Sequence, residues 1–313
     1  KTADGIRTWR PDWGVGQVRL AGCRADVGLP DLTVAGAAAA GARTMVVGVA
    51  NAGGTIPEAW LPVLESALDH GMDVASGLHA RLDAQPVLLA ASRRTGRRLV
   101  DVRHPADALP VASGAERLGK RLATVGTDCS VGKMYTALAL EAEMRAAGLA
   151  ADFRATGQTG IFIAGGGICL DAVVGDFIAG AAEALCPDNA PDHWDVVEGQ
   201  GSLHHPSFAG VTLGLLHGAQ PDALVLCHEP TRRHMRGLPH QPLPDPAACL
   251  EAHLNAARLT NPAVKPLGIA VNTRALDDES AQAEVARLAA ALNLPAVDPV
   301  RHGVAPLLEG LPA

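Results

Sequence analysis

The stretch Gly126-Thr127-Asp128-Cys129-Ser130-Val131-Gly132-Lys133-Met134 lies between an apolar run and an alanine-rich run. Residues 121–125 have the length and branching of a short buried strand, and residues 135–147 are mostly strong helix formers. A glycine-flanked loop between a strand and a helix, with Gly-Lys at the helix start, directs backbone N–H groups and an ammonium at phosphate oxygens. The sequence therefore predicts a phosphate-binding P-loop over residues 126–134 and Tyr135, rather than a glycine-rich turn without a ligand.

This loop departs from the commonest P-loop in its spacing and in its last residue. Gly132 follows Gly126 at an offset of six instead of five, and this longer form resembles the GTDxxxGKT loop of dethiobiotin synthetase. The commonest form continues with Ser or Thr, whose hydroxyl ligates Mg²⁺, whereas Met134 offers only a thioether, a poor ligand for a hard cation. We therefore expect a diphosphate cradle rather than Mg-ATP chemistry, although Thr127, Thr136 or a downstream carboxylate could restore a metal site.

Length and composition narrow the class of protein. A chain of 313 residues is long enough for two domains that each bury a core, and 3 % aromatic content means that small aliphatic side chains fill those cores. The net charge of −7 and the absence of a basic stripe argue against nucleic-acid binding, and no apolar run has the length of a membrane span. Six cysteines without a CxxC pair suit reduced thiols. We expect a cytoplasmic homo-oligomer with small-molecule substrates and no nucleic-acid or membrane partner.

Residues 1–104 alternate strand-like and helix-like runs, which predicts a Rossmann-like α/β domain with a parallel sheet. The expected strands are 44–49, 72–76 and 98–102, and the expected helices are 57–70 and 85–95. Asn51-Ala52-Gly53-Gly54 follows the first strand but lacks the full dinucleotide fingerprint, so an ordinary turn is favoured over a cofactor site. Because the sequence begins with lysine, a segment preceding it is expected in the natural chain.

Residues 105–120 are rich in Pro, Ala, Ser and Gly without periodicity and form the predicted linker. Residues 121–313 are predicted to form a P-loop NTPase-like, doubly wound α/β domain. Its expected strands are 121–125, 151–154, 194–198, 222–227 and 265–271, and its clearest helices are 135–147, 247–259 and 279–292.

Acidic and polar residues follow the second and third of these strands, at the edge where such sheets bind ligands. Arg154 and Gln158 are placed to hold an anionic or amide group near the cradle. Asp171 and Asp176 suit metal binding or deprotonation of an amine, or else helix capping and surface charge. Glu198 leaves a buried strand before two small turns, which makes it the strongest candidate for a metal-holding or water-positioning acid.

Histidine, cysteine and amide groups accompany them. His204 and His205 can shuttle protons near neutral pH, or can be solvated loop residues. Cys129 lies at a helix N-terminus, where a lowered pKa is expected if the thiol does more than pack. Asn272, a candidate cofactor ligand, closes the fifth strand, where its amide can bind a base or a carboxylate.

An arginine-rich segment follows the fourth strand. The HExxxxH spacing of residues 228–234 differs from the zinc-protease HExxH, and Pro230 interrupts the helix that would align two histidines. No metal site is predicted there. Arg232, Arg233 and Arg236 suit carboxylates or phosphates better.

Five motifs in order along the chain resemble a bacterial and archaeal P-loop family formerly of unknown function, the DUF1611 type. They are GTDCSVGKMYTALAL, DFRATGQTG, VVEGQGSLHHP, CHEPTRRHMRG and IAVNTR, and the opening Lys1-Thr2-Ala3 fits as well. The family includes a D-glutamate N-acetyltransferase of D-glutamate catabolism. The element that starts at Glu198 also resembles the EGAGG segment of dethiobiotin synthetase, which implies distant kinship with ATP-dependent ligases.

The resemblance implies acetyl transfer from acetyl-CoA to the amine of D-glutamate, with Lys133 neutralising the pyrophosphate of coenzyme A. Loop N–H groups would stabilise the oxyanion. The candidate bases are Glu198, Asp176 and His205, and the candidate substrate ligands are Arg154, Gln158, Arg232, Arg233 and Arg236. The alternatives are an ATP- and Mg²⁺-dependent ligase or kinase of the dethiobiotin synthetase type, and a non-catalytic nucleotide-binding module.

Overall fold

The computed structural model describes residues 2–105 and 108–312, which divide into two compact units. The first unit contains the described residues of Lys1–Ala106 together with Gln158–Ala172. The second contains the described residues of Asp107–Gly157 and Val173–Ala313. The chain therefore returns to the first unit midway through the second. The domain boundaries predicted from the sequence stay a prediction, because compactness does not measure which segments fold independently.

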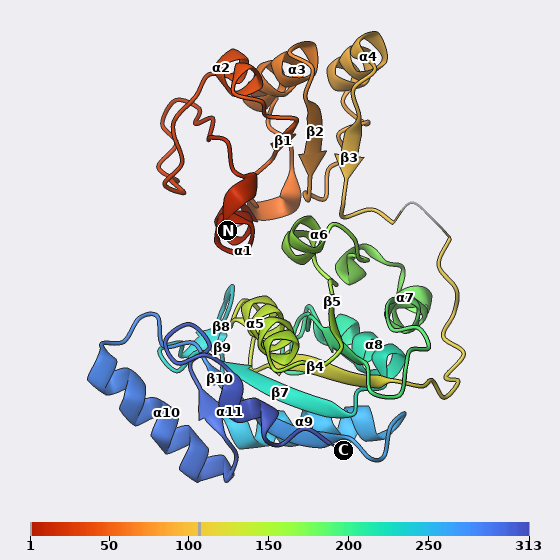
Figure 1. Cartoon of the computed structure of the whole chain (residues 1–313), viewed down its shortest axis with the longest axis vertical. Coiled ribbons are helices and arrows are strands. Elements are labelled where there is room, and N and C mark those ends of the chain that lie inside the picture. Colours follow the sequence, from red (N-terminus) through yellow and green to blue (C-terminus); the bar gives the residue numbers. More distant parts are fainter. Residues whose placement is uncertain (1, 106–107, 313) are drawn as a thin grey trace. The chain divides into compact units, whose positions relative to one another are not determined.

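Three parallel strands form the sheet of the first unit, in the order β1 (Thr44–Val46), β2 (Asp73–Ser76), β3 (Leu99–Asp101) (Figure 1). The connecting helices are α3 (Leu61–Asp69) and α4 (Pro86–Thr95). Each carries a proline in its first turn, where the missing N–H has no intrahelical partner to lose. The other helical segments are α1 (Thr2–Trp9), α2 (Val34–Ala39), α6 (Gln158–Ala164) and the 3-10 segments Pro11–Trp13, Ala52–Gly54, Glu58–Trp60 and Leu170–Ala172. This confirms the Rossmann-like sheet.

Six parallel strands form the sheet of the second unit, in the order β11-β10-β7-β4-β6-β5. These strands are β4 (Lys120–Gly126), β5 (Ala151–Arg154), β6 (Trp194–Val197), β7 (Ala223–His228), β10 (Lys265–Val271) and β11 (Ala296–Val297). The helices are α5 (Lys133–Ala146), α7 (Ile178–Leu185), α8 (Ala209–Ala219), α9 (Pro246–Arg258), α10 (Asp278–Leu292), α11 (Ala305–Leu308) and the 3-10 segment Gly175–Phe177. A small antiparallel hairpin joins β8 (His234–Met235) and β9 (Leu238–Pro242).

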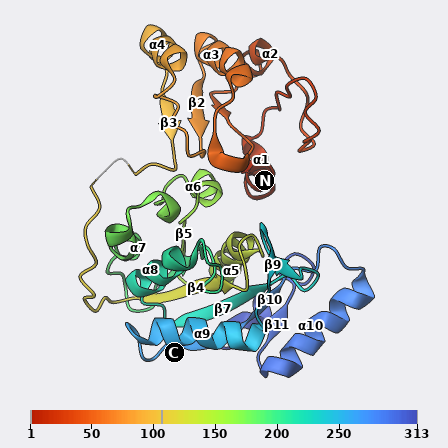
Figure 2. The same ribbon diagram turned by 180° about the vertical axis from the view of Figure 1, so that it is seen from behind.

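Helices cover both faces of the six-stranded sheet, which confirms the doubly wound P-loop fold. Figure 1 shows α5 and α11 on one face, and Figure 2 shows α9 on the opposite face. Successive side chains of β10 point to opposite faces of the sheet and enter two hydrophobic clusters. Ala270 belongs to the cluster that contains residues of α5, whereas Ile269 and Val271 pack with Leu288 of α10. In the part of the chain that the structure describes, no helix is both long and apolar enough to span a membrane.

The strand order places a ligand crevice at β4. From β4 the chain runs to the edge strand β5, returns to β6, and then crosses β4 to reach β7. Successive connections therefore leave β4 in opposite directions, and the loops at its carboxyl end separate there. Parallel pairing puts the ends of β6 and β7 at the same edge, with Ala123 beside Val197 and Gly126 beside Cys227.

The imidazole of His253 is among the fully buried ionisable side chains of the second unit. His253 of α9 has no exposed surface, and its Nδ1–H donates to the carbonyl oxygen of Cys249 at 2.7 Å. Burial lowers the pKa of His253 from 6.5 to about 4, with a smaller contribution from the charge of Lys133. The imidazole is therefore neutral in the folded protein.

Acidification is expected to destabilise the fold through His253. In the unfolded chain this imidazole takes up a proton below pH 6.5, whereas the folded protein resists protonation down to about pH 4. Its contribution is fully present above pH 6.5 and falls as the pH decreases, by about 2 kcal/mol at pH 5. Urea unfolding of wild type and His253→Gln at pH 7 and pH 5 measures this. Equal pH dependence in the two proteins would contradict it, and His302→Gln, at an exposed site, is the control.

Candidate active site

The loop between β4 and α5 encloses the ammonium of Lys133. Its Nζ donates to the carbonyl oxygen of Asp128 at 2.8 Å, and it would lie 3.2 Å from a Cβ placed on Gly126. The N-cap of α5 is Gly132 with φ of 117°, and Ser130 also has a positive φ of 57°. These left-handed residues curl the loop, so that the buried ammonium and the N-terminus of α5 lie together. That combination binds anions.

The buried carboxylate of Asp128 joins the P-loop to the segment after β7. Its Oδ1 accepts from the N–H of Cys129 at 2.7 Å. Its Oδ2 accepts from Nη1 of Arg232 at 2.7 Å and from the N–H of Arg236 at 2.8 Å. Charge-assisted bonds of this kind are roughly twice as strong as neutral ones. The loop is therefore preorganised by Asp128.

The three arginines after β7 have different roles in this structure. Arg232 donates to the carbonyl oxygens of Cys129 at 2.7 Å and Ser130 at 3.3 Å, and pairs closely with Glu229. It therefore braces the P-loop. Arg236 donates to the hydroxyl of Ser130 and is exposed. Arg233 is also exposed.

The loop after β6 presses against β4. The N–H of Gly199 donates to the hydroxyl of Thr124 at 2.9 Å, and that hydroxyl donates to the carbonyl oxygen of Lys133 at 3.2 Å. A Cβ on Gly199 would lie 1.7 Å from the carbonyl oxygen of Thr124. Only glycine therefore fits between the two strand ends. Neither contact was foreseen from the sequence, where the one signal is a polar Thr124 inside a buried strand.

Glu198 holds the loop that follows β5. The side chain is buried, and Oε2 accepts from the N–H groups of Thr156 at 3.0 Å and Gly157 at 3.1 Å. The hydroxyl of Thr156 also donates to the carbonyl oxygen of Glu198 and accepts from the amide of Gln200 at 3.1 Å. Glu198 thus fixes the position of a neighbouring loop at the sheet edge.

His205 has hydrogen bonds at both ring nitrogens. Nδ1 accepts from the N–H of Ser207 at 3.2 Å, so the proton is on Nε2, which donates to the carbonyl oxygen of Arg236 at 3.2 Å. The ring also packs on Phe208, with centroids 4.6 Å apart. His205 therefore connects the loop after β6 to the segment after β7.

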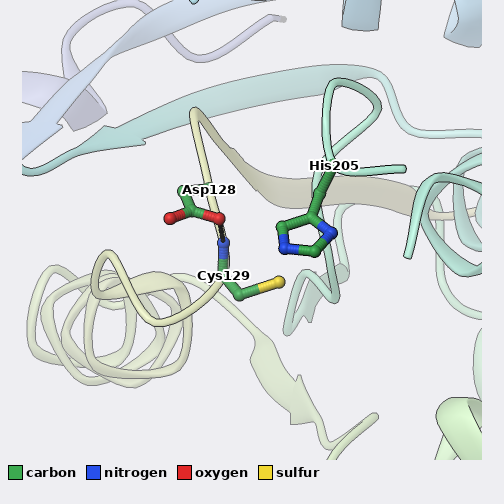
Figure 3. A group of neighbouring side chains, drawn as sticks. All are labelled: Asp128, Cys129 and His205. Atoms are coloured by element: carbon green, nitrogen blue, oxygen red, sulfur yellow. Dashed lines mark hydrogen bonds between the residues drawn. The ribbon is translucent and has the colours of Figure 1, made fainter. Parts of the chain in front are cut away.

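Asp128 and Cys129 of the P-loop lie close to His205, with potential ligand atoms of the three residues within 4.8 Å of one another (Figure 3). Burial raises the pKa of the Cys129 thiol, against the opposing charge of Lys133, so the lowered pKa expected from the sequence is wrong. Metals bind the thiolate, and the oxygens of Asp128 are already bonded to N–H groups. These donors do not fit a metal centre.

The remaining candidates from the sequence lie in different places. Asn272 follows the carboxyl end of strand β10, and its N–H donates to the carbonyl oxygen of His228 at 2.8 Å. The guanidinium of Arg154 pairs with Asp195 on β6 at 2.7 Å. Asp176 is exposed, with no hydrogen-bond or ion-pair partner in residues 2–105 and 108–312. Gln158 begins α6 in the first compact unit. The structure therefore gathers the P-loop, Glu198, His205, Arg232, Arg236 and Asn272 at one edge of the sheet.

Known proteins share this architecture. Residues 18–105 match the model of a Rossmann-like domain described as a domain of unknown function, DUF1611_N. Residues 110–308 match a P-loop domain described as a domain of unknown function, DUF1611_C. A crystal structure of a DUF1611 family protein from Anabaena variabilis superposes with a TM-score of 0.83 at 37 % identity, covering 90 % of this chain and 83 % of that one.

Two curated relatives match almost the whole length. A protein named D-glutamate N-acetyltransferase from Tritonibacter scottomollicae is 55 % identical over 100 % of this chain and 94 % of its own length. A protein of the same name from a Pseudoalteromonas species is 48 % identical over 99 % of this chain and 94 % of its own length. With both domain models matched in order, the chain belongs to the DUF1611 family.

Proposed function

We propose that the protein transfers the acetyl group of acetyl-CoA to the amine of D-glutamate, forming N-acetyl-D-glutamate and coenzyme A. The observation that carries this proposal is the match to two relatives of that name at 55 % and 48 % identity over nearly the whole chain. The P-loop geometry agrees with it, because coenzyme A carries a pyrophosphate that such a loop binds.

Residues 126–135 are proposed to hold the coenzyme A phosphates. Lys133 supplies the charge, and the N-terminus of α5 supplies oriented N–H groups and a favourable dipole. Met134 stands where a magnesium-dependent P-loop has a hydroxyl, which suits a phosphate site that needs no metal. Asn272 follows β10, two strands from β4 in the sheet, and is proposed to bind another part of the cofactor.

The amino-acid acceptor is proposed to bind beside the P-loop, at the segment after β7. D-Glutamate brings two carboxylates, and exposed guanidinium groups bind carboxylates with geometric selectivity. Arg233 and Arg236 are exposed there and are the proposed clamps, while Arg232 keeps the loop in shape. Arg154 is not assigned a substrate contact, because its guanidinium is paired with Asp195.

Acetyl transfer is tested by thiol release from acetyl-CoA. We expect thiol release with D-glutamate. We expect it to be much slower with L-glutamate or D-aspartate, because the site must orient two carboxylates and one amine together. The product is identified by mass spectrometry as acetylated amino acid. Wild type that releases no thiol with any amino acid, but hydrolyses ATP when Mg²⁺ is added, belongs instead to the dethiobiotin synthetase type.

We also propose a cytoplasmic, homo-oligomeric enzyme. All six cysteines are free, five of them at least partly buried, which suits a reducing compartment. Symmetric homo-oligomers are the commonest state among soluble oligomers. Light scattering of the purified chain measures the assembly.

A further inference from the structure

The tip of the β8–β9 hairpin holds Arg236 beside the P-loop. Met235 pairs with Leu238, so Arg236 and Gly237 are the two residues of the turn, and Gly237 has a positive φ of 80°. The two strands form a sheet of their own, separate from the six-stranded sheet. A hairpin of two strands is marginally stable by itself, so contacts outside the hairpin must hold its tip in place.

Two side chains from other loops bind the backbone of Arg236. Its N–H donates to Oδ2 of Asp128 at 2.8 Å, and its carbonyl oxygen lies 3.2 Å from Nε2 of His205. The hydrogen bond that closes a two-residue turn joins the residues on either side of it, so the hairpin itself satisfies neither group. Asp128 has no exposed surface, and His205 is 2 % exposed. The tip is therefore attached to the P-loop on one side and to the loop after β6 on the other.

The two contacts of His205 define what its ring can do. The N–H of Ser207 lies 3.2 Å from Nδ1 and can only donate, so Nδ1 uses its lone pair in that bond. The carbonyl oxygen of Arg236 can only accept, so Nε2 carries the proton. Neither nitrogen keeps a lone pair for a proton of the amino-acid substrate. In this arrangement His205 is a hydrogen-bond donor rather than a base.

The P-loop also orients the guanidinium of Arg236. Its Nη1 donates to the hydroxyl of Ser130, a residue whose positive φ of 57° helps to curl the loop. Nε and Nη2 of this exposed side chain have no hydrogen-bond partner within residues 2–105 and 108–312. These two N–H groups lie on one edge of the planar guanidinium, an arrangement that binds both oxygens of a carboxylate. Arg236 therefore presents a free carboxylate-binding edge next to the P-loop.

We propose that Arg236 binds one carboxylate of the amino-acid acceptor and that His205 is a positioning residue that holds Arg236 in place. This role rests on the proposed function and distinguishes Arg236 from Arg233. Both backbone groups of Arg236 and one nitrogen of its guanidinium are fixed before the substrate arrives, so little conformational freedom is lost on binding. The side chain of Arg233 makes no such contact in the part of the chain that the structure describes.

Substitution of Arg236 tests the carboxylate contact. We expect Arg236→Gln to raise KM for D-glutamate by about 10²-fold, and Arg236→Lys by about tenfold, because lysine keeps the charge but lacks the edge with two N–H groups. KM for acetyl-CoA should stay within about threefold in both variants. Arg93→Gln, at an exposed arginine on α4 of the first unit, is the matched control and should behave as wild type. An Arg236→Gln enzyme with the wild-type KM for D-glutamate overturns the assignment.

Two substitutions of His205 separate a donor from a base. Glutamine can place its amide nitrogen near the position of Nε2 and donate to the carbonyl oxygen of Arg236, but it takes no proton from an ammonium group. We expect His205→Gln to keep kcat, both KM values and the pH profile of kcat/KM within about threefold of wild type. His205→Leu should raise KM for D-glutamate by about tenfold and leave KM for acetyl-CoA within about threefold.

The double variant shows whether His205 acts through Arg236. In the Arg236→Gln background, His205→Leu should add little to KM for D-glutamate, because the residue that it positions no longer binds the carboxylate. A fall of kcat by about 10²-fold or more in His205→Gln makes His205 a base and overturns its positioning role. A wild-type KM for D-glutamate in His205→Leu also overturns that role.

The tautomer of His205 and the binding of D-glutamate are measured without turnover. In ¹⁵N-histidine-labelled protein, His205 should show a protonated Nε2 and an unprotonated Nδ1, and a proton on Nδ1 overturns the positioning role even if acetyl transfer is confirmed. If wild type binds D-glutamate in a calorimetric titration but transfers no acetyl group, the proposed function fails, whereas loss of that binding in Arg236→Gln still confirms the carboxylate contact. Absence of both transfer and binding overturns the two proposals together.

Discussion

Gly199→Ala is expected to remove acetyl transfer and to destabilise the second unit. The added methyl group would lie 1.7 Å from the carbonyl oxygen of Thr124 and 2.9 Å from Cδ of Lys133. The first of these atoms belongs to the backbone of β4 and cannot rotate away. Relieving the overlap requires the loop after β6 to move off the strand, at a cost of about 3 kcal/mol. A displacement of about 1 Å at reacting groups lowers rates by about 10²-fold.

Urea unfolding and thiol release measure the two effects of Gly199→Ala. Gly210→Ala is the matched control, because a Cβ on Gly210 meets no atom within 4 Å and the residue lies in helix α8. Alanine favours a helix over glycine, so this control should be as stable as wild type or slightly more so. Wild-type stability and rate in Gly199→Ala would show that the loop after β6 does not need to lie against β4.

Lys133→Ala is expected to lower kcat/KM for acetyl-CoA by about 10²- to 10³-fold, the loss typical of a preorganised group that binds anionic charge. The ammonium is buried within the curve of the loop and is held there by the carbonyl oxygen of Asp128. Without it, the loop keeps its N–H groups but loses its one buried cation. Calorimetric titration with coenzyme A should show the same loss in affinity.

Lys265→Ala is the control for Lys133→Ala, since Lys265 is exposed at the start of β10. The affinity of Lys265→Ala for coenzyme A should match that of wild type at the same ionic strength. The comparison distinguishes the loss of a local contact with Lys133 from the general effect of removing one positive charge. If Lys133→Ala binds coenzyme A as wild type does, the P-loop does not hold its phosphates. The proposed cofactor site would then have to be sought elsewhere in the chain.

The regular elements were predictable because local signals define them. Strands β5 and β10 occupy the predicted residues, and α9 and α10 begin within one residue of prediction. Asp245 caps α9 by accepting from the N–H groups of Ala247 and Ala248, and Asp277 caps α10 in the same way. Such signals lie within a few residues of the element that they delimit. The two-residue strand β11 and the β8–β9 hairpin carry no comparable pattern and were missed.

The roles within the site were not predictable, because partners distant in sequence decide them. Arg232 and Arg233 are adjacent and chemically identical. Arg232 is bonded to Asp128, 104 positions earlier in the sequence, and holds the P-loop, whereas Arg233 is exposed. The guanidinium of Arg154 is likewise hydrogen-bonded to Asp195, 41 positions later in the sequence. The lowered pKa considered for the Cys129 thiol followed from the helix N-terminus alone, whereas burial, which raises that pKa, dominates in the folded chain.

The return of Gln158–Ala172 to the first unit limits how this protein can be recombined. A gene cut in the linker separates the two family domains but leaves the first without this segment. Gly77 would then lose the side chain of Gln158, which lies 2.6 Å from its would-be Cβ, and the buried Arg103 would lose its partner Asp171. A chimaera that exchanges the first domain between family members must therefore carry both segments from one parent, in the manner of an inserted domain rather than a tandem one.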